Sequence, residues 1–378
     1  MGENCISFLI GHPDPGALLT AELYASVQSV INTSQASIAL QYGPEQGTQS
    51  LLEVLREKLR REQDLSIQIE NLMVVAGSTH AVDMLTRLYA RSGGVVLVEA
   101  PTYADAIHIF RDHQVELYAV PMDDEGLITS ALEQQVAELY ARGKSPCMLY
   151  TIPNFHNPTG STLAEARRLE VIKLARRYGF LIVEDDVYRD LSFEATVPRS
   201  FYALANGKQV LSIGSFSKTL APGLRLGWLL GPEDAIQRCI GCGTTQMGGG
   251  ANPFTAHIVA EYCRQGYWEK HMAQVRSLYQ SRRDAALAAL ERYMPADVRW
   301  TRPAGGFFTW LRLPEHVFAQ DVKRLALQEG VEMASGEGFF LNPSDGAHHL
   351  RLAYSCAAYD DIDAGIRILA QVIDRARA

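Results

Sequence analysis

Short apolar runs alternate with helical segments from about residue 70 to residue 230, and this alternation limits the possible fold more than any other feature. The runs are rich in Val, Ile and Leu without polar alternation, which is typical of strands buried on both faces. They predict strands at 72–75, 95–98, 115–120, 148–150, 180–183 and 210–213, with helices between them at 78–91, 103–112, 129–141 and 164–178. Such an order predicts an α/β domain whose mostly parallel sheet is sandwiched by helices.

The two ends of the chain predict a smaller α+β domain. The sequence patterns indicate helices at 17–31, 48–63, 266–293, 318–329 and 359–377, and strands at 298–301, 307–312 and 350–353. We therefore expect a discontinuous small domain of residues 1–40 and 286–378, built around a large domain of residues 41–285.

Composition excludes several classes of protein. Hydrophobic residues make up 47% of the 378-residue chain and charged residues 21%, so it can bury a large core. The net charge of −8 argues against a nucleic-acid partner, because such binding rests on cationic contacts to phosphates. There is no run of 18 apolar residues, which argues against a membrane span.

The cysteines and the first residues favour a cytoplasmic protein. The segment 1–5 lacks the basic region of a secretory signal. Six cysteines are sparse for a chain of this length, and the Cys239–Cys242 pair has no second pair with which to hold zinc. We expect reduced, structural thiols and no bound metal.

The carboxyl ends of the predicted strands are where a ligand should bind in a sheet of this kind. The first strand ends in Gly77-Ser78-Thr79-His80 and opens a helix, whose free N–H groups suit an anion, although Ser and Thr are also ordinary helix caps. Another strand runs into Asn157-Pro158-Thr159-Gly160, which is either a surface turn or a loop that presents an Asn to a ligand.

An acidic cluster, Glu184-Asp185-Asp186, ends the strand at 180–183. Acidic side chains there must be solvated, paired or bound to metal. Adjacent acids point in different directions and no His lies at ligand spacing, so a single carboxylate paired with a ligand cation is favoured over a metal site.

Lys218 is the lysine whose surroundings most suggest chemistry. It follows the strand at 210–213 inside Ser215-Phe216-Ser217-Lys218, between apolar flanks. A desolvated lysine becomes a nucleophilic amine, and such amines form aldimines with pyridoxal phosphate. Arg225 and the two serine hydroxyls suit a phosphate dianion. The alternative is a lysine whose amine reaches solvent.

Taken in this order, the motifs resemble those of the fold-type I pyridoxal-phosphate enzymes, specifically the class I/II aminotransferases. The chain is most similar to the branch that includes 2-aminoadipate, kynurenine and broad-specificity aminotransferases. The resemblance rests on Asn157-Pro158-Thr159-Gly160, Asp185-Asp186-Val187-Tyr188 and Ser215-Phe216-Ser217-Lys218 followed by Arg225, and spans residues 11–355.

The resemblance implies pyridoxal 5'-phosphate as cofactor and a set of roles for residues around its ring. Lys218 would form the aldimine and then move the substrate proton. Asp185, three residues before Tyr188, would pair with the pyridinium nitrogen. Asn157 and Tyr188 would hydrogen-bond the phenolic oxygen, and Tyr103 would stack on the ring.

The resemblance also implies how phosphate and substrate are held. The phosphate would be bound by Ser78, Thr79, Ser215, Ser217 and Arg225. Tyr42 would reach the phosphate of a neighbouring subunit, so a homodimer with shared active sites is expected. Arg351 would clamp the substrate carboxylate, with Asn157 beside it, and Gly11 and His12 would close over the substrate. Arg351 is otherwise an ordinary arginine at the end of a strand.

The implied activity is a ping-pong transamination between an L-amino acid and a 2-oxo acid. One alternative keeps the cofactor but catalyses elimination, cyclisation or oxidation in specialised amino-acid metabolism. Another is the aminotransferase-like effector domain of a transcription regulator, which the net negative charge disfavours.

Overall fold

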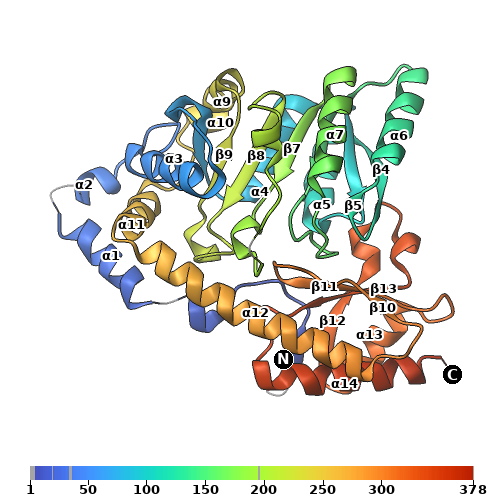
Figure 1. Ribbon diagram of the computed structural model, residues 1–378. Helices are drawn as coiled ribbons and strands as arrows, with labels where there is room; N and C mark the ends of the chain where they lie inside the picture. Colours follow the sequence, from blue (N-terminus) through green and yellow to red (C-terminus); the bar gives the residue numbers. More distant parts are fainter. Residues whose placement is uncertain (1–4, 19, 34–35, 195, 378) are drawn as a thin grey trace.

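An eight-stranded sheet forms the centre of the larger part of the molecule (Figure 1). The computed structural model describes residues 5–18, 20–33, 36–194 and 196–377. Along the sheet the strands follow in the order β2 (Leu72–Val75), β9 (Gly227–Leu230), β8 (Val210–Ser215), β7 (Leu181–Asp185), β6 (Pro146–Thr151), β3 (Val95–Ala100), β4 (Glu116–Asp123) and β5 (Gly126–Leu127).

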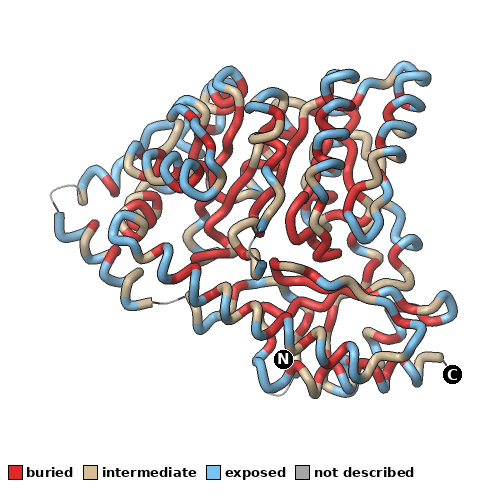
Figure 2. Tube along the Cα trace, in the orientation of Figure 1, coloured by how far each residue is buried: buried red, intermediate tan, exposed pale blue. Residues whose placement is uncertain are grey.

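The middle of this sheet is parallel, as predicted. Strands β8, β7, β6, β3 and β4 run in one direction, while β9 is antiparallel to both of its neighbours and β5 pairs antiparallel with β4. Figure 2 shows the strands as a buried layer and the outer faces of the helices as exposed. The continuous apolar runs are therefore buried on both faces, which is why they lack polar alternation.

Helices connect the parallel strands. They are α4 (Ser78–Leu85), α5 (Ala104–Asp112), α6 (Thr129–Ala141) and α7 (Glu165–Tyr178). The helix expected at 78–91 is α-helical only to Leu85 and continues as a π-helical turn over Thr86–Ala90. Helix α7 ends where Gly179 takes the left-handed conformation that favours glycine (φ +77°).

A second, five-stranded sheet forms the smaller part. Its order is β1 (Ile6–Phe8), β12 (Val331–Ser335), β13 (His349–Ala353), β11 (Phe308–Arg312) and β10 (Arg299–Trp300). Helices α13 (Ala319–Gln328) and α14 (Tyr359–Arg375) contribute to the core of this part, together with the C-terminal end of α12 (Tyr267–Tyr293). Strand β1 pairs parallel with β12, so the first and last parts of the chain meet in this sheet.

Helix α12 crosses between two hydrophobic cores (Figure 1). Its residues up to Tyr279 pack in the core of the large sheet, and its residues from Ala286 pack in the core of the small sheet.

The N-terminal helices lie differently from our expectation. Helix α1 (Ala21–Ile31) packs against α11 (Pro253–Arg264), which also packs against α3 (Gln49–Gln63). Val30, Ala39 of α2 (Ala36–Ala39) and Ile258 form a small apolar cluster there. Residues 1–40 are expected in the small domain, whereas the apolar side chains of α1 and α2 pack against α11 on the side of the large sheet.

The remaining elements are short. They are η1 (Pro15–Ala17), η2 (Ile69–Asn71), η4 (Arg189–Leu191), α8 (Phe201–Leu204), η5 (Pro222–Leu224), α9 (Glu233–Ile240), α10 (Gly243–Gln246), η6 (Gly336–Phe339) and η7 (Pro343–Gly346). No described helix is long and apolar enough to cross a membrane. Residues 1–4, used above to argue against a secretory signal, lie outside the described residues.

Candidate active site

Three loops carry the predicted site residues to one edge of the large sheet. Strands β6, β7 and β8 are parallel neighbours, so their carboxyl ends meet at that edge. Asn157 lies in the loop after β6, Asp185 ends β7, and Lys218 follows β8. The arrangement anticipated from the strand ends is thus present in the fold.

The amine of Lys218 lies largely out of water. Its Nζ donates a hydrogen bond to the Gly11 carbonyl oxygen at 3.0 Å and lies 6.0 Å from the centroid of the Tyr188 ring. Burial and the charge of Arg351 lower the pKa of Lys218 to about 8, against the opposing charge of Asp185. The amine is therefore much closer to its neutral, nucleophilic form at physiological pH than an exposed lysine is.

Gly11 brings the N-terminal segment directly over this amine. A Cβ at position 11 would lie 2.3 Å from the Phe308 ring, so the close approach of backbone to ring requires glycine. The neighbouring His12 is exposed, and partial burial together with the charge of Lys218 lowers its pKa. Both residues thus lie close to Lys218, and their closing over a substrate remains a prediction.

Asp185 is a buried carboxylate with one occupied oxygen. Its Oδ2 accepts a hydrogen bond from the Tyr150 hydroxyl at 2.6 Å, while its buried Oδ1 finds no hydrogen-bond partner among the described residues. Burial raises the pKa of Asp185 to about 6, and the Tyr150 hydrogen bond opposes this shift. The free oxygen is suited to accept a hydrogen bond from a ligand N–H.

The other two acids of the cluster have structural partners. Glu184 accepts backbone hydrogen bonds from Phe201 and Tyr202. Asp186 accepts from the Asn154 side chain at 2.6 Å and pairs with Arg189 at 3.3 Å. The described residues contain no group of three or more His, Cys, Asp or Glu side chains placed to hold a metal.

The guanidinium of Arg351 lies between two aromatic rings, and one of its N–H groups has no hydrogen-bond partner among the described residues. Its guanidinium carbon is 4.5 Å from the Phe308 ring centroid and 4.9 Å from that of Phe339. Its Nη1 donates to Asn157 Oδ1 at 3.0 Å and its Nη2 to the Leu9 carbonyl at 2.6 Å, whereas Nε has no partner in the described part of the chain.

Burial lowers the pKa of Arg351 to about 10, so the group remains a cation at neutral pH. A buried cation with a free donor favours a carboxylate ligand.

Tyr188 and Tyr103 both lie close enough to Asp185 to feel its charge. Tyr188 is buried, with its ring edge-on to Phe307 and Phe308 at 5.7 Å each, and burial raises its pKa. The Tyr103 hydroxyl donates to Asp105 Oδ2 at 2.5 Å, and burial raises the pKa of Tyr103 too. The stacking predicted for Tyr103 remains a prediction.

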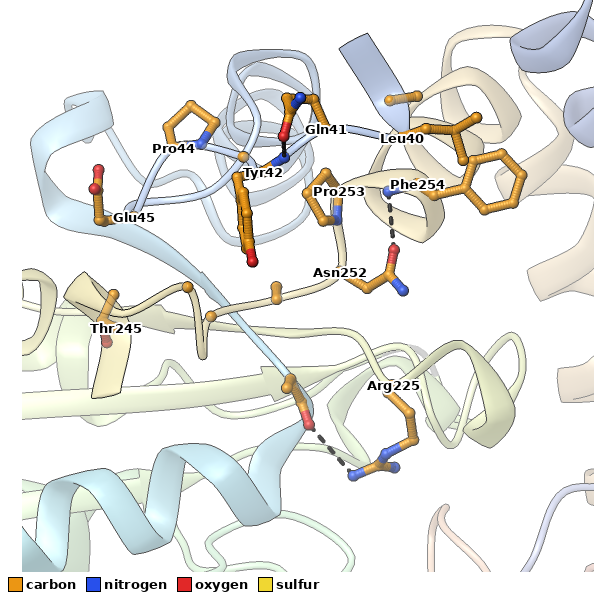
Figure 3. Close-up of a pocket in the computed structure, with 16 residues that line it drawn as sticks. Leu40, Gln41, Tyr42, Pro44, Glu45, Arg225, Thr245, Asn252, Pro253 and Phe254 are labelled. Carbon is orange, nitrogen blue, oxygen red and sulfur yellow. Dashed lines mark hydrogen bonds between the residues drawn. The ribbon is translucent and has the colours of Figure 1, made fainter. Parts of the chain in front are cut away.

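Residues predicted to bind the phosphate lie where β2 and β8 end. Gly77 precedes α4 with a φ of +87°, and a Cβ there would lie 2.9 Å from Arg225 Nη2. That nitrogen donates to the Ala76 carbonyl at 3.3 Å (Figure 3).

The predicted phosphate-binding hydroxyls have different surroundings. Ser78 is half-buried and Thr79 is exposed in the first turn of α4. Ser215 is buried, and its Oγ accepts a hydrogen bond from the Ser217 N–H at 3.0 Å. His80 supports the same turn, because its Nδ1 accepts from the Ala76 N–H at 3.1 Å.

Tyr42 and Arg225 line one open cavity of about 600 Å³, shown in Figure 3. Tyr42 is 83% exposed and lies beside the glycine-rich loop near Gly248, where an added Cβ would meet its ring at 3.0 Å. The structure thus brings Tyr42 to the cavity of its own chain's Arg225. Its predicted reach into a neighbouring subunit remains a prediction.

Sequence reasoning missed Tyr150 and Phe308, which contact Asp185 and Arg351. Both lie in buried strands, where an aromatic residue reads as ordinary core. The one available signal was a polar hydroxyl inside an otherwise apolar strand, because a buried hydroxyl needs a partner.

Comparisons with known proteins identify the family of the chain. The family model "Aminotransferase class I and II" matches residues 3–368. Aromatic-amino-acid aminotransferase 1 of Thermococcus litoralis is 35% identical over 98% of this chain and 88% of its own. A Bacillus subtilis protein described as the uncharacterized HTH-type transcriptional regulator YisV is 33% identical over 89% of this chain and 68% of its own.

A solved structure is also similar over nearly the full length. The kynurenine aminotransferase of Pyrococcus horikoshii, determined in complex with PMP, superposes with a TM-score of 0.93 and 34% identity, covering 99% of this chain and 92% of that one. With the family model matching almost the whole length, the chain belongs to the class I and II aminotransferases.

Proposed function

We propose that the edge formed by β6, β7 and β8 is the active site of a pyridoxal-phosphate-dependent transaminase that exchanges an amino group between an L-amino acid and a 2-oxo acid. The observation that carries the proposal is the convergence of three buried groups: the desolvated amine of Lys218, the free oxygen of Asp185 and the incompletely bonded guanidinium of Arg351. Pyridoxal 5'-phosphate is the cofactor of this aminotransferase.

The residues at the site fit this cofactor. The unpartnered Oδ1 of Asp185 suits a protonated ring nitrogen. The start of α4 and Arg225 suit the phosphate, since a helix N-terminus and a guanidinium both favour a dianion. We assign the phosphate contacts to Ser78, Thr79, Ser215, Ser217 and Arg225, and the ring contacts to Tyr103, Asn157, Asp185 and Tyr188.

When bound, the cofactor supplies an aldehyde carbon that exchanges amino groups and a ring that accepts electrons from the substrate Cα. Lys218 Nζ, neutral above its lowered pKa of about 8, would accept the proton from the substrate Cα and pass it, in the same half-reaction, to the cofactor carbon that takes the amino group. The second half-reaction would reverse this transfer. Asp185 keeps the ring nitrogen protonated, because its buried negative charge stabilises the cation.

Arg351 binds the substrate carboxylate. The hydrogen bonds that it makes to Asn157 and the Leu9 carbonyl place its guanidinium beside the aromatic rings of Phe308 and Phe339. Gly11 and His12 lie over Lys218 and exclude water from the reacting atoms.

We further propose a homodimer that associates through the face around Tyr42. Ile38, Leu40, Tyr42 and Met247 are large apolar side chains with more than half of their surface exposed. A cluster of such side chains is typical of a protein–protein interface. In the dimer, Tyr42 of each chain reaches the phosphate site of its partner.

The cell compartment and the division into domains are also proposals. All six cysteines fall within the described residues and are free thiols, which supports a cytoplasmic protein. The two hydrophobic cores support a large and a small domain that meet within α12.

The test of the proposed function is the replacement Lys218→Ala, with Lys208→Ala as the matched control in an exposed turn. We expect the Lys218→Ala variant to lose the visible absorbance of attached cofactor. Its transaminase rate should fall by roughly 10²–10⁴-fold. The Lys208→Ala variant should keep both the absorbance and the rate. A Lys218→Ala variant that retains attached cofactor and activity would overturn the proposal.

A further inference from the structure

Tyr150 is buried near the carboxyl end of β6 (Pro146–Thr151) and its hydroxyl meets the carboxylate that ends β7. None of its surface is exposed, and its ring packs edge-on against Phe110 with centroids 5.5 Å apart. Its hydroxyl donates to Asp185 Oδ2 at 2.6 Å. Burial and the charge of Asp185 raise the pKa of Tyr150 well above its ordinary value, so the hydroxyl stays a donor at all physiological pH values.

Because of this contact, the two oxygens of Asp185 differ in their hydrogen bonding. Oδ2 is occupied by the tyrosine, whereas Oδ1 is buried and has no partner among the described residues. A carboxylate held through one oxygen cannot rotate freely, so the other oxygen keeps a fixed direction. The fold therefore presents a single oriented acceptor to the ligand.

The same hydrogen bond acts on the charge of Asp185. Burial favours the protonated acid, and the Tyr150 donor favours the carboxylate. The other titratable groups that act on Asp185 or are acted on by it are Asp186 on its own segment, Lys218 after β8, Tyr188 before η4 and Tyr103 at the start of α5. Of these, Asp186 disfavours the charged form and Lys218 favours it.

We propose that Tyr150 is a positioning residue that aims Asp185 Oδ1 at the ring nitrogen of the cofactor and keeps this carboxyl ionised at neutral pH. The inference rests on the proposed function, because it takes Asp185 as the partner of that nitrogen. Tyr150 itself touches neither substrate nor reacting atoms and acts through Asp185.

The test measures binding of pyridoxamine phosphate to cofactor-free protein by fluorescence titration between pH 5 and pH 8. This ligand needs no reaction with Lys218, so the readout is independent of catalysis. We expect Tyr150→Phe to weaken binding by about tenfold at neutral pH, the loss of one charge-assisted hydrogen bond. The loss should grow toward acidic pH, because removing the donor raises the pKa of Asp185 above about 6.

Tyr354→Phe is the matched control. Its side chain is 1% exposed and its hydroxyl donates to the Gly305 carbonyl at 3.1 Å, so the change also removes one buried hydrogen bond. We expect Tyr354→Phe to lower the melting temperature without moving the pH midpoint of binding. A purely structural role of Tyr150 would give the same pattern in Tyr150→Phe and would overturn the inference.

A double-mutant cycle with Asp185→Asn isolates the coupling. If Tyr150 acts through the charge of Asp185, Tyr150→Phe costs much less affinity in the Asp185→Asn background than in the native one. An equal cost in both backgrounds contradicts the inference.

A second variant keeps the hydroxyl and the fold. Replacing Tyr150 by 3-fluorotyrosine gives a more acidic phenol, which is a stronger donor and should move the midpoint to lower pH. An unchanged midpoint contradicts the inference. Failure of the native protein to bind pyridoxamine phosphate would instead count against the proposed function, so the two failures are distinguishable.

Discussion

At the scale of single residues, the pKa of Lys218 depends on its burial and on the charges of Arg351 and Asp185. Arg351 lowers the pKa of Lys218, and Asp185 opposes that effect. Burial keeps these interactions strong, since few water molecules remain to screen them. The pKa of Lys218, and with it the pH dependence of its reaction, should therefore change when the charge of Arg351 is removed.

The first prediction is a pH profile. The rate at which cofactor-free protein attaches pyridoxal phosphate should rise with pH through a midpoint near 8, because burial favours the neutral amine that reacts. Arg351→Gln removes a neighbouring positive charge, so it should raise the pKa of Lys218 and move the midpoint upward. The exposed strand residue Arg312 provides the control variant Arg312→Gln, for which no shift is expected.

Absorbance during reconstitution measures both midpoints. A native midpoint at the ordinary lysine pKa of 10.5 would contradict the burial of this amine. A midpoint in Arg351→Gln that equals the native one would contradict the effect of the Arg351 charge on the pKa of Lys218.

The sequence alone points to candidate site residues where their place after a predicted strand, or their spacing within a motif, is itself unusual. Lys218 stands out because it follows a buried strand. The choice of Asp185 over Asp186 rested on spacing, and the structure adds that Asp186 is engaged by Asn154 and Arg189. Tyr150 could not be predicted from the sequence, because no local pattern shows that the hydroxyl of a tyrosine in a buried strand meets a residue 35 positions later.

At the scale of elements, the loop after β6 joins the two parts of the molecule. It carries Asn157, which accepts a hydrogen bond from Arg351 of β13. Thr159 accepts one from the Thr301 hydroxyl at 2.6 Å. Gly160 packs directly on β11, where an added Cβ would lie 2.5 Å from the Phe308 carbonyl oxygen. A distortion of this loop should reach both the cofactor site and the substrate site.

The second prediction compares two glycines with the same backbone conformation. Gly160 and Gly143 have φ values of +71° and +72°, but an added Cβ meets nothing within 4 Å at Gly143. Gly143→Ala should lower the free energy of unfolding by about 1 kcal/mol, the cost of left-handed backbone. Gly160→Ala should lower it by a further 1–3 kcal/mol or so, since the backbone neighbour cannot move aside easily.

Urea unfolding followed by tryptophan fluorescence measures both losses. Equal losses in the two variants would mean that the loop is not fitted closely against β11.

Several short strands and the 12-residue helix α11 were not predicted from the sequence. β1 has three residues, β9 has four and β12 has five, which is too few for a periodic pattern. Strand β9 also enters the sheet antiparallel, directly after the turn that carries Arg225. Length alone does not decide the outcome for helices, since α5 with nine residues and α13 with ten were predicted whereas α11 with 12 was not.

At the scale of the whole molecule, the cofactor site is open toward the face that carries Tyr42. That side chain and Arg225 line the same cavity, and Tyr42 is almost fully exposed. In the proposed dimer a second chain covers this face, and each Tyr42 serves the site of its partner.

The third prediction tests this exchange with mixed dimers. Tyr42→Ala and Lys218→Ala homodimers should both be weakly active. Dimers that combine the two variants contain one site with native Lys218 and the native Tyr42 of its partner. Random mixing should therefore restore about a quarter of native activity, since half of the dimers are mixed and one of their two sites is intact. If Tyr42 serves its own chain, no activity returns.

The central claim is a transamination in two half-reactions, and a single spectroscopic titration tests it most directly. On addition of an L-amino acid to the cofactor-loaded protein, we predict that the absorbance of the aldehyde form is lost with stoichiometric release of a 2-oxo acid and no ammonia. Addition of a second oxo acid, 2-oxoglutarate or pyruvate, should restore that absorbance. Release of ammonia, or product formation while the aldehyde absorbance persists, would contradict the account and favour elimination or oxidation on the same fold.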